Sequence, residues 1–228
     1  FISMKRKKLN IESFSYYGAE IRYIGALPDE NTVFLSGGKS MGREGIVAMY
    51  RSSLEAAANE WSVSYIPGLQ YSEAVERGLY ERDKGALFAF VPMGIKCASL
   101  SLISRCLVTG GGVISTVNDD SVFSLEALSS CRSLAHSLSR ATIIGNENLS
   151  SIPYSIMSAL DEGRDVGVLE SALNGKGVRN LVREGAPIVR SFSDFLSTPR
   201  YISFPYSKGK YGIMGERFGL LDIERHEK

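Results

Sequence analysis

The chain has 228 residues, of which 44% are hydrophobic and 22% are charged, as in an ordinary globular protein with one substantial core. Its 26 Lys and Arg residues almost balance 25 Asp and Glu residues, so the formal net charge is +1. A strongly basic nucleic-acid binder is therefore excluded by bulk charge, and any such role would need local clustering of cations. No apolar run approaches the ~20 residues that a transmembrane helix needs, and we expect no membrane partner.

The few sulfur and imidazole side chains argue against a metal centre. Cys97, Cys106 and Cys131 form no C-x-x-C pair and are odd in number, which fits reduced thiols in a cytoplasmic protein. His136 and His226 are the only histidines in the sequence, so too few imidazole groups are present to favour a histidine-dependent catalytic triad or metal site. We therefore expect no metal and no cofactor.

Short apolar runs alternate with helical patterns along the chain. The expected strands are 21–24, 33–36, 62–66, 86–91, 112–115, 142–144, 165–168 and 187–189. The expected helices are 43–59, 72–82, 98–106, 123–137, 153–162, 177–184 and 192–196. Short strands that are apolar on both faces, each followed by a helix, indicate an α/β fold with a doubly wound, mostly parallel sheet and helices on both faces.

We expect one such domain over residues 18–198. Residues 1–17 are basic and then polar-aromatic, with Lys5 to Lys8 as a charged run, and are interpreted as a mobile lead-in. Residues 199–228 contain several aromatic side chains among glycines and charges, and we expect a hairpin or a partner-binding tail. We expect no full winged-helix domain over residues 199–228.

A glycine turn, Gly37-Gly38-Lys39-Ser40, joins the apolar run 33–36 to the helical pattern 43–59. It is not a P-loop, because Val33 stands where the first glycine of that motif belongs, and the glycine spacing does not fit a dinucleotide fingerprint. Two interpretations stay open. Either glycine is needed for a positive φ in a tight turn, or backbone N–H groups and the helix N-terminus bind a phosphate or another anion.

A second cluster, Gly110-Gly111-Gly112, precedes the expected strand 112–115. We favour a flexible connection here. Phosphoribohydrolases of the lysine-decarboxylase-like group also carry three glycines, but the Pro-Gly-Gly segment that follows in those enzymes has no counterpart in this chain.

Taken together, the motifs resemble the DNA-processing DprA/Smf family in their order along the chain. Gly37-Gly38-Lys39 falls in the frame of the family's Gly-Ser-Arg turn, and Arg132 is the charge that is retained from its Arg-Asn-Arg helix. Gln70 and Val75 replace an Asp and a His of the family pattern. The matching segments are 21–25, 33–39, 64–70, 87–95, 112–115, 131–139, 150–166 and 177–186.

The resemblance implies an extended Rossmann-like fold and a non-enzymatic role. Members bind and protect single-stranded DNA, help to load the RecA-type recombinase in natural transformation, and usually form homodimers. The DNA phosphates would contact Gly37, Gly38, Lys39, Ser40 and Arg132, with Lys96 as a further cation at the same edge of the sheet.

Two other functions stay open. The same turn is compatible with a nucleotide-binding enzyme or sensor, similar to the phosphoribohydrolases, for which Glu44 and Glu126 are the carboxylates that we would nominate. A scaffold that acts through self-association or partner contacts, with the aromatic tail as its surface, is the third hypothesis.

Overall fold

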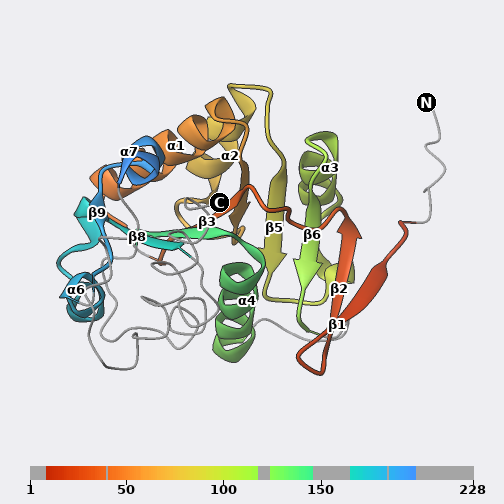
Figure 1. The fold of residues 1–228 in the computed structure, drawn as a ribbon. Helices are drawn as coiled ribbons and strands as arrows, with labels where there is room; N and C mark the ends of the chain where they lie inside the picture. Colours follow the sequence, from red (N-terminus) through yellow and green to blue (C-terminus); the bar gives the residue numbers. More distant parts are fainter. Residues whose placement is uncertain (1–8, 40, 118–123, 146–164, 184, 199–228) are drawn as a thin grey trace, which may run out of the picture.

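The computed structural model describes residues 9–39, 41–117, 124–145, 165–183 and 185–198. Nine strands form one sheet in the order β1-β2-β6-β5-β4-β3-β7-β8-β9 (Figure 1). The strands are β1 Glu12–Tyr16, β2 Ala19–Gly25, β3 Thr32–Ser36, β4 Ser62–Tyr65, β5 Leu87–Val91, β6 Gly112–Ser115, β7 Ala141–Ile144, β8 Asp165–Leu169 and β9 Ile188–Val189.

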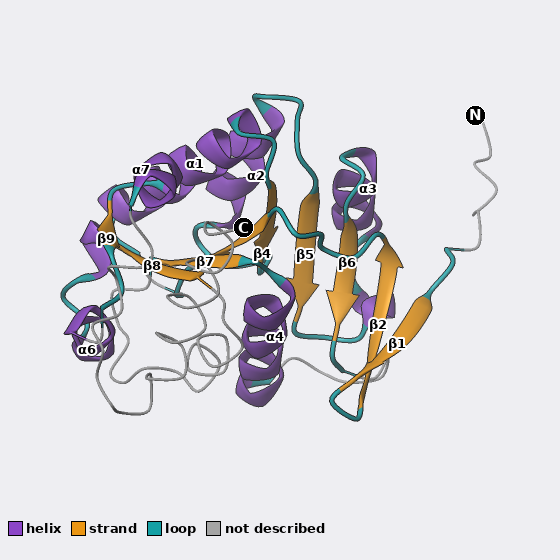
Figure 2. Cartoon of the chain, viewed as in Figure 1, coloured by secondary structure: helices purple, strands orange, loops and turns teal. Residues whose placement is uncertain are grey.

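The strands from β6 to β9 in this order are parallel, whereas β2 runs antiparallel to β6 and to β1 (Figure 2). The chain starts the parallel sheet at β3 and builds outward through β4, β5 and β6. It then returns to the other side of β3 with β7, β8 and β9. The direction of winding therefore reverses between β3 and β7, and in open α/β sheets ligands bind at this point, beyond the carboxyl ends of the strands.

Helices cover both faces of the sheet (Figure 1). The helices α1, α2, α3 and α7 pack on one face, where their apolar side chains join Val33, Leu35 and Val63 in the largest hydrophobic cluster. The helices α4 and α6 pack on the other face, α4 around Phe34 and Phe90 and α6 around Val166 and Val168, as separate clusters. The bounds are α1 Arg43–Ala58, α2 Ser72–Tyr80, α3 Leu100–Val108, α4 Leu125–Leu138, α6 Lys176–Arg183 and α7 Phe192–Ser197.

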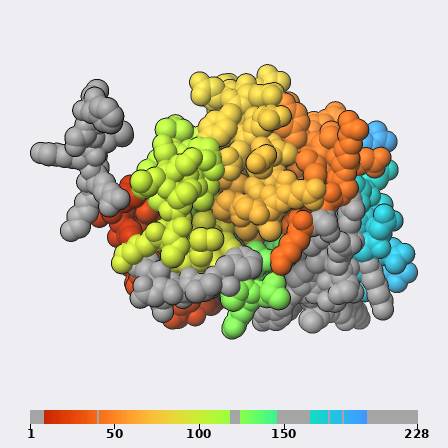
Figure 3. Space-filling model, turned by 180° about the vertical axis from the view of Figure 1, so that it is seen from behind, coloured from red at the N-terminus to blue at the C-terminus, as the bar shows by residue number. Residues whose placement is uncertain are grey.

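The space-filling view from behind shows α1, α2 and α3 as adjoining surfaces, orange through yellow to lime (Figure 3). Because both faces are covered, β3, β4, β5 and β6 are buried along their whole length.

The expected α/β class and doubly wound sheet are confirmed. Phe88 and Phe90 of β5 are buried. No helix in the described part of the chain is long and apolar enough to span a membrane.

The first strand was not expected. Residues 12–16, which we interpreted as part of a mobile lead-in, form β1 and pair with β2 from Glu12–Tyr23 to Tyr16–Ala19. The expected boundary at residue 18 falls inside the hairpin turn, where Tyr17 and Gly18 both have positive φ, as in a type I′ turn. The missed signal is an alternation of period two: Phe14 and Tyr16 pack against the core of the α4 face, while the polar residues between them point to solvent.

The triple-glycine segment is also not the flexible connection that we favoured. Gly110 ends the turn after α3 with a positive φ, and a Cβ on Gly111 or Gly112 would overlap the backbone carbonyls of Leu87 or Ala26. These glycines are needed because strands approach closely at the amino ends of β5 and β6. They therefore lie at the edge of the sheet opposite to the carboxyl ends of the strands.

The remaining expectations fall outside the described residues. These are the charged run at 5–8, Ser40, the expected helix at 153–162 and the C-terminal segment 199–228.

Candidate functional site

The segments that follow β3, β4 and β5 meet at the carboxyl edge of the sheet, where α4 covers one face. They are residues 37–39 after β3, residues 66–70 after β4 and residues 92–97 after β5. Lys39, Gln70 and Met93, one from each segment, line a common cavity of about 330 Å³ together with Leu128 of α4. The sheet thus brings together parts of the chain that are far apart in sequence, at the edge where ligands bind in this class of fold.

Gly37 is the fixed point of the glycine turn. Its carbonyl accepts a hydrogen bond of 2.9 Å from the Arg132 guanidinium, although the two residues are 95 positions apart. Its φ is not positive, and a Cβ at this position would overlap the ring of Tyr71. Glycine is required here because an aromatic ring packs on the backbone, so the interpretation that it is needed for a positive φ is wrong.

Tyr71 is a fully buried support between the segments after β3 and β4. Its hydroxyl oxygen accepts a hydrogen bond of 3.3 Å from the backbone N–H of Ile66. Burial raises the pKa of Tyr71 above its ordinary value, and hydrogen bonds from the Ile66 and Gly37 backbones with the charge of Arg132 oppose that shift. A neutral tyrosine therefore holds two of the loops at this edge in a fixed relation.

Arg132 projects from α4 towards the glycine turn and is half-buried. One terminal nitrogen of its guanidinium binds Gly37, but the Nε is buried and has no hydrogen-bond partner among the described residues. A buried donor without a partner is costly, so this atom marks a place for a hydrogen-bond acceptor. The structure thus brings together Gly37 and Arg132, two residues that the resemblance in sequence motifs suggested as contacts for DNA phosphates.

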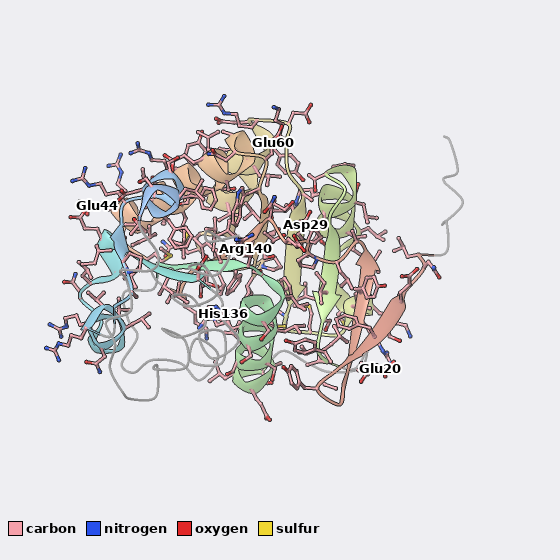
Figure 4. All side chains as sticks on the ribbon, viewed as in Figure 1. Glu20, Asp29, Glu44, Glu60, His136 and Arg140 are labelled. Carbon is pink, nitrogen blue, oxygen red and sulfur yellow. The ribbon has the colours of Figure 1, made fainter. Side chains whose placement is uncertain are left out.

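One turn further along α4, His136 lies against the sheet (Figure 4). It is buried, its Nδ1 lies 2.9 Å from the Thr142 hydroxyl, and its ring packs edge-on against Phe34. Burial, helped by the charge of Arg132, lowers the pKa of His136 to about 3. This side chain is a neutral packing residue and not an acid or a base for catalysis at neutral pH.

The other nominated residues are less tightly held. Gly38 is buried beside Gly37, and Lys39 is exposed at the cavity. Lys96 is exposed on η1, a 3-10 turn at Ile95–Cys97, and it does not line the cavity that Lys39 lines. Ser40 lies outside the described residues.

Cys131 is the neighbour of Arg132 in sequence, but its thiol is buried against the end of β5. It donates a hydrogen bond of 2.9 Å to the Val91 carbonyl. Burial raises the pKa of Cys131 to about 12, so the arginine does not make this thiol reactive.

The carboxylates that an enzyme would need do not line the cavity. Glu44 stands near the start of α1 and lines a different hollow, with Glu170 and Arg190, well away from His136 in Figure 4. Glu126 is exposed in the first turn of α4. Within the described ranges, no group of three or more His, Cys, Asp or Glu side chains is arranged to hold a metal ion.

Similar folds occur among solved structures. DNA processing protein A (DprA) from Streptococcus pneumoniae superposes with a TM-score of 0.64, over 88% of this chain and 76% of that chain, at 14% sequence identity. This chain has the DprA fold. No protein-family model matches it, and a search of curated proteins finds no relative.

Two further structures share the arrangement. DprA from Helicobacter pylori, described with its single-stranded DNA binding mode, matches with a TM-score of 0.60 at 13% identity, over 83% of this chain and 95% of that chain. The molybdenum cofactor binding protein from Rippkaea orientalis matches with a TM-score of 0.54 at 12% identity, over 74% of this chain and 94% of that chain. The resemblance to DprA drawn from the motifs is thus confirmed for the fold.

Tyr71 and Gln70 are the site residues that sequence reasoning missed. Gln70 had been noted only as a replacement for the family's Asp, yet its side-chain oxygen accepts a hydrogen bond of 3.1 Å from the Met41 backbone N–H and so ties the segment after β4 to the start of α1. A signal was available: both residues follow Pro67-Gly68, a turn signal at the end of an apolar strand, and Gly68 does have a positive φ.

Proposed function

We propose that this chain binds single-stranded DNA by its phosphates at the carboxyl edge of the DprA-like sheet. The observation that carries the proposal is the Arg132–Gly37 contact at a glycine turn next to an exposed lysine. At this contact the buried Nε of Arg132 has no partner among the described residues. A phosphate oxygen is an acceptor of the required kind, and the guanidinium is a preferred donor to it.

Local charge supports the proposal even though the net charge is only +1. Lys39 and Lys96 are exposed at the same edge, and no carboxylate is among the described residues that line the cavity next to Lys39. Each phosphate that such cations neutralise releases counterions, so binding should weaken steeply as salt rises.

The biological role that we propose is the one implied by the resemblance to the DprA/Smf family. In this proposal the protein is a non-enzymatic mediator that acts in the cytoplasm, protects incoming DNA and presents it to a RecA-type recombinase in natural transformation. It would do so as a homodimer. The match of fold to two DprA structures supports this role.

The test is fluorescence anisotropy with a labelled single-stranded oligonucleotide at low and moderate salt. The Lys39→Glu variant should bind at least about tenfold more weakly, because it replaces an attractive charge at the phosphate by a repulsive one. The matched control is Lys84→Glu. Lys84 is also exposed and forms a surface ion pair of 3.5 Å with Glu60, but it lies at the amino edge of the sheet, before β5.

Equal losses in the two variants would contradict a site at the glycine turn. Absence of salt-sensitive binding by the unmodified chain would contradict DNA binding altogether. The alternative function, a nucleotide-binding enzyme or sensor, would then be tested with nucleoside monophosphates, because the cavity of about 330 Å³ is within the size range of small-ligand sites.

A further inference from the structure

We infer that the cavity beside Lys39 receives one unstacked base of the bound strand, and that Gln70 selects a base that presents a carbonyl oxygen. This inference rests on the proposed function and adds a binding site for the base to the site for the phosphate. The protein then distinguishes between bases at one position of the strand, in addition to binding the DNA backbone.

The first argument is the shape and chemistry of the cavity. Its volume of about 330 Å³ is near the lower end of small-ligand sites, which run from about 300 to 1,000 Å³ and suit one small group more than a stack of several. Ile66, Met93 and Leu128 supply apolar walls from the segments after β4 and β5 and from α4. Apolar side chains pack against the faces of a planar ring, as they do around the extruded bases in the pockets of base-flipping enzymes.

The second argument is the orientation of Gln70. Because its side-chain oxygen accepts the hydrogen bond from the Met41 N–H, the amide is held in one orientation and its NH₂ group is the end that remains as a donor. Gln70 lines the cavity, and this is the one hydrogen bond that its side chain makes within the described residues. A base carbonyl is the acceptor that the NH₂ group would pair with, and thymine carries two carbonyls.

The third argument is the position of Lys39. It lines the same cavity, so a phosphate held by its ammonium group would be adjacent to the base that enters. A base in a duplex is paired and stacked and cannot enter such a cavity without being flipped out. The cavity therefore also gives a physical reason for a preference for single strands.

The experiment compares labelled dT12, dC12 and a 12-mer whose backbone carries no bases, with the unmodified chain, Gln70→Glu and a control. The carboxylate of Gln70→Glu can still accept the Met41 N–H hydrogen bond but has no NH₂ donor for a base. It also repels phosphates, which weakens every oligomer, so the decisive readout is the ratio of the dT12 to the dC12 affinity. Ser104→Glu, which adds the same charge at an exposed position of α3, is the control.

The inference predicts that the base-free oligomer binds at least about tenfold more weakly than dT12 to the unmodified chain. Gln70→Glu should lower the dT12 to dC12 ratio by roughly three- to tenfold, because only cytosine offers an amino donor to the new carboxylate, and Ser104→Glu should leave the ratio unchanged.

A ratio that Gln70→Glu does not change would overturn the inference. If the base-free oligomer also bound like dT12 while Lys39→Glu still abolished binding, the phosphate site would stand without a base site. If no oligomer bound in a salt-sensitive way, the proposed function and this inference would both fall.

Discussion

At the scale of single residues, the candidate site depends on contacts between residues that are distant in sequence. Gly37 must lack a side chain because Tyr71 packs on it, and its carbonyl is held by Arg132. The sequence alone identified Gly37, Lys39 and Arg132 through motifs. It did not identify Tyr71, because an aromatic residue before a helix carries no local sign of what its ring will contact.

His136 makes stability depend on pH at this scale. Its pKa falls from 6.5 to about 3 on folding, because it is buried and faces Arg132. The unfolded chain therefore binds the proton more readily, so this contribution to stability is complete above pH 6.5 and is lost as pH falls towards 3. Between pH 6.5 and 4.5 this group alone should lower the free energy of unfolding by about 1.4 kcal/mol per pH unit.

The measurement is urea unfolding at several pH values in that range, for the unmodified chain and for His136→Gln, whose amide can still pair with the Thr142 hydroxyl. The variant should have the shallower dependence on pH. Two curves with the same slope would show that His136 does not titrate in this way.

At the scale of elements, a charged network joins α2 to α3 and to β4. The Glu76 carboxylate accepts a hydrogen bond of 2.5 Å from the Tyr65 hydroxyl, and its second oxygen lies 2.9 Å from the Nε of Arg105. Glu76 and Arg105 line a polar hollow of about 710 Å³ between the two helices. Glu76 in turn raises the pKa of Arg105, although burial opposes this shift. Because Arg105 is paired with Glu76, and Glu73 adds a further carboxylate to the lining, we interpret the hollow as structural and not as a second phosphate site.

A double-mutant cycle on Glu76→Ala and Arg105→Ala tests this assignment. Each single change leaves a partly buried group without its partner, so the two should couple by about 1–2 kcal/mol in urea unfolding. The exposed pair Lys84 and Glu60 is the control and should couple by less than about 0.5 kcal/mol. Equal coupling in the two pairs would mean that the network is no more than a surface ion pair.

At the scale of the whole molecule, the sheet is wider than the sequence predicted because β1 extends its antiparallel edge. Among the described strands β1 pairs with β2 alone, and its rings Phe14 and Tyr16 cover part of the cluster around Phe34. The domain is therefore incomplete if it starts at residue 18, where we first drew its boundary.

Deletion of residues 1–17 should lower the free energy of unfolding by about 2–4 kcal/mol, because two half-buried aromatic rings are lost and β2 becomes an unprotected edge. Thermal or urea unfolding measures the difference. Deletion of residues 1–8 alone, which leaves β1 intact, is the control and should change stability little. A chain that starts at residue 18 and is as stable as this control would contradict the role of β1.

The sequence by itself determined the fold class and most elements of this protein. Strands that are apolar on both faces, and the turns between them, depend on residues close together in the chain, and so does the glycine turn that led to Lys39. The tertiary structure alone decided the strand order and therefore which loops share an edge. Parallel pairing joins strands through long crossovers, so no local pattern could place Gly110-Gly111-Gly112 at the amino edge or bring Arg132 and Gln70 into contact with the connection between β3 and α1.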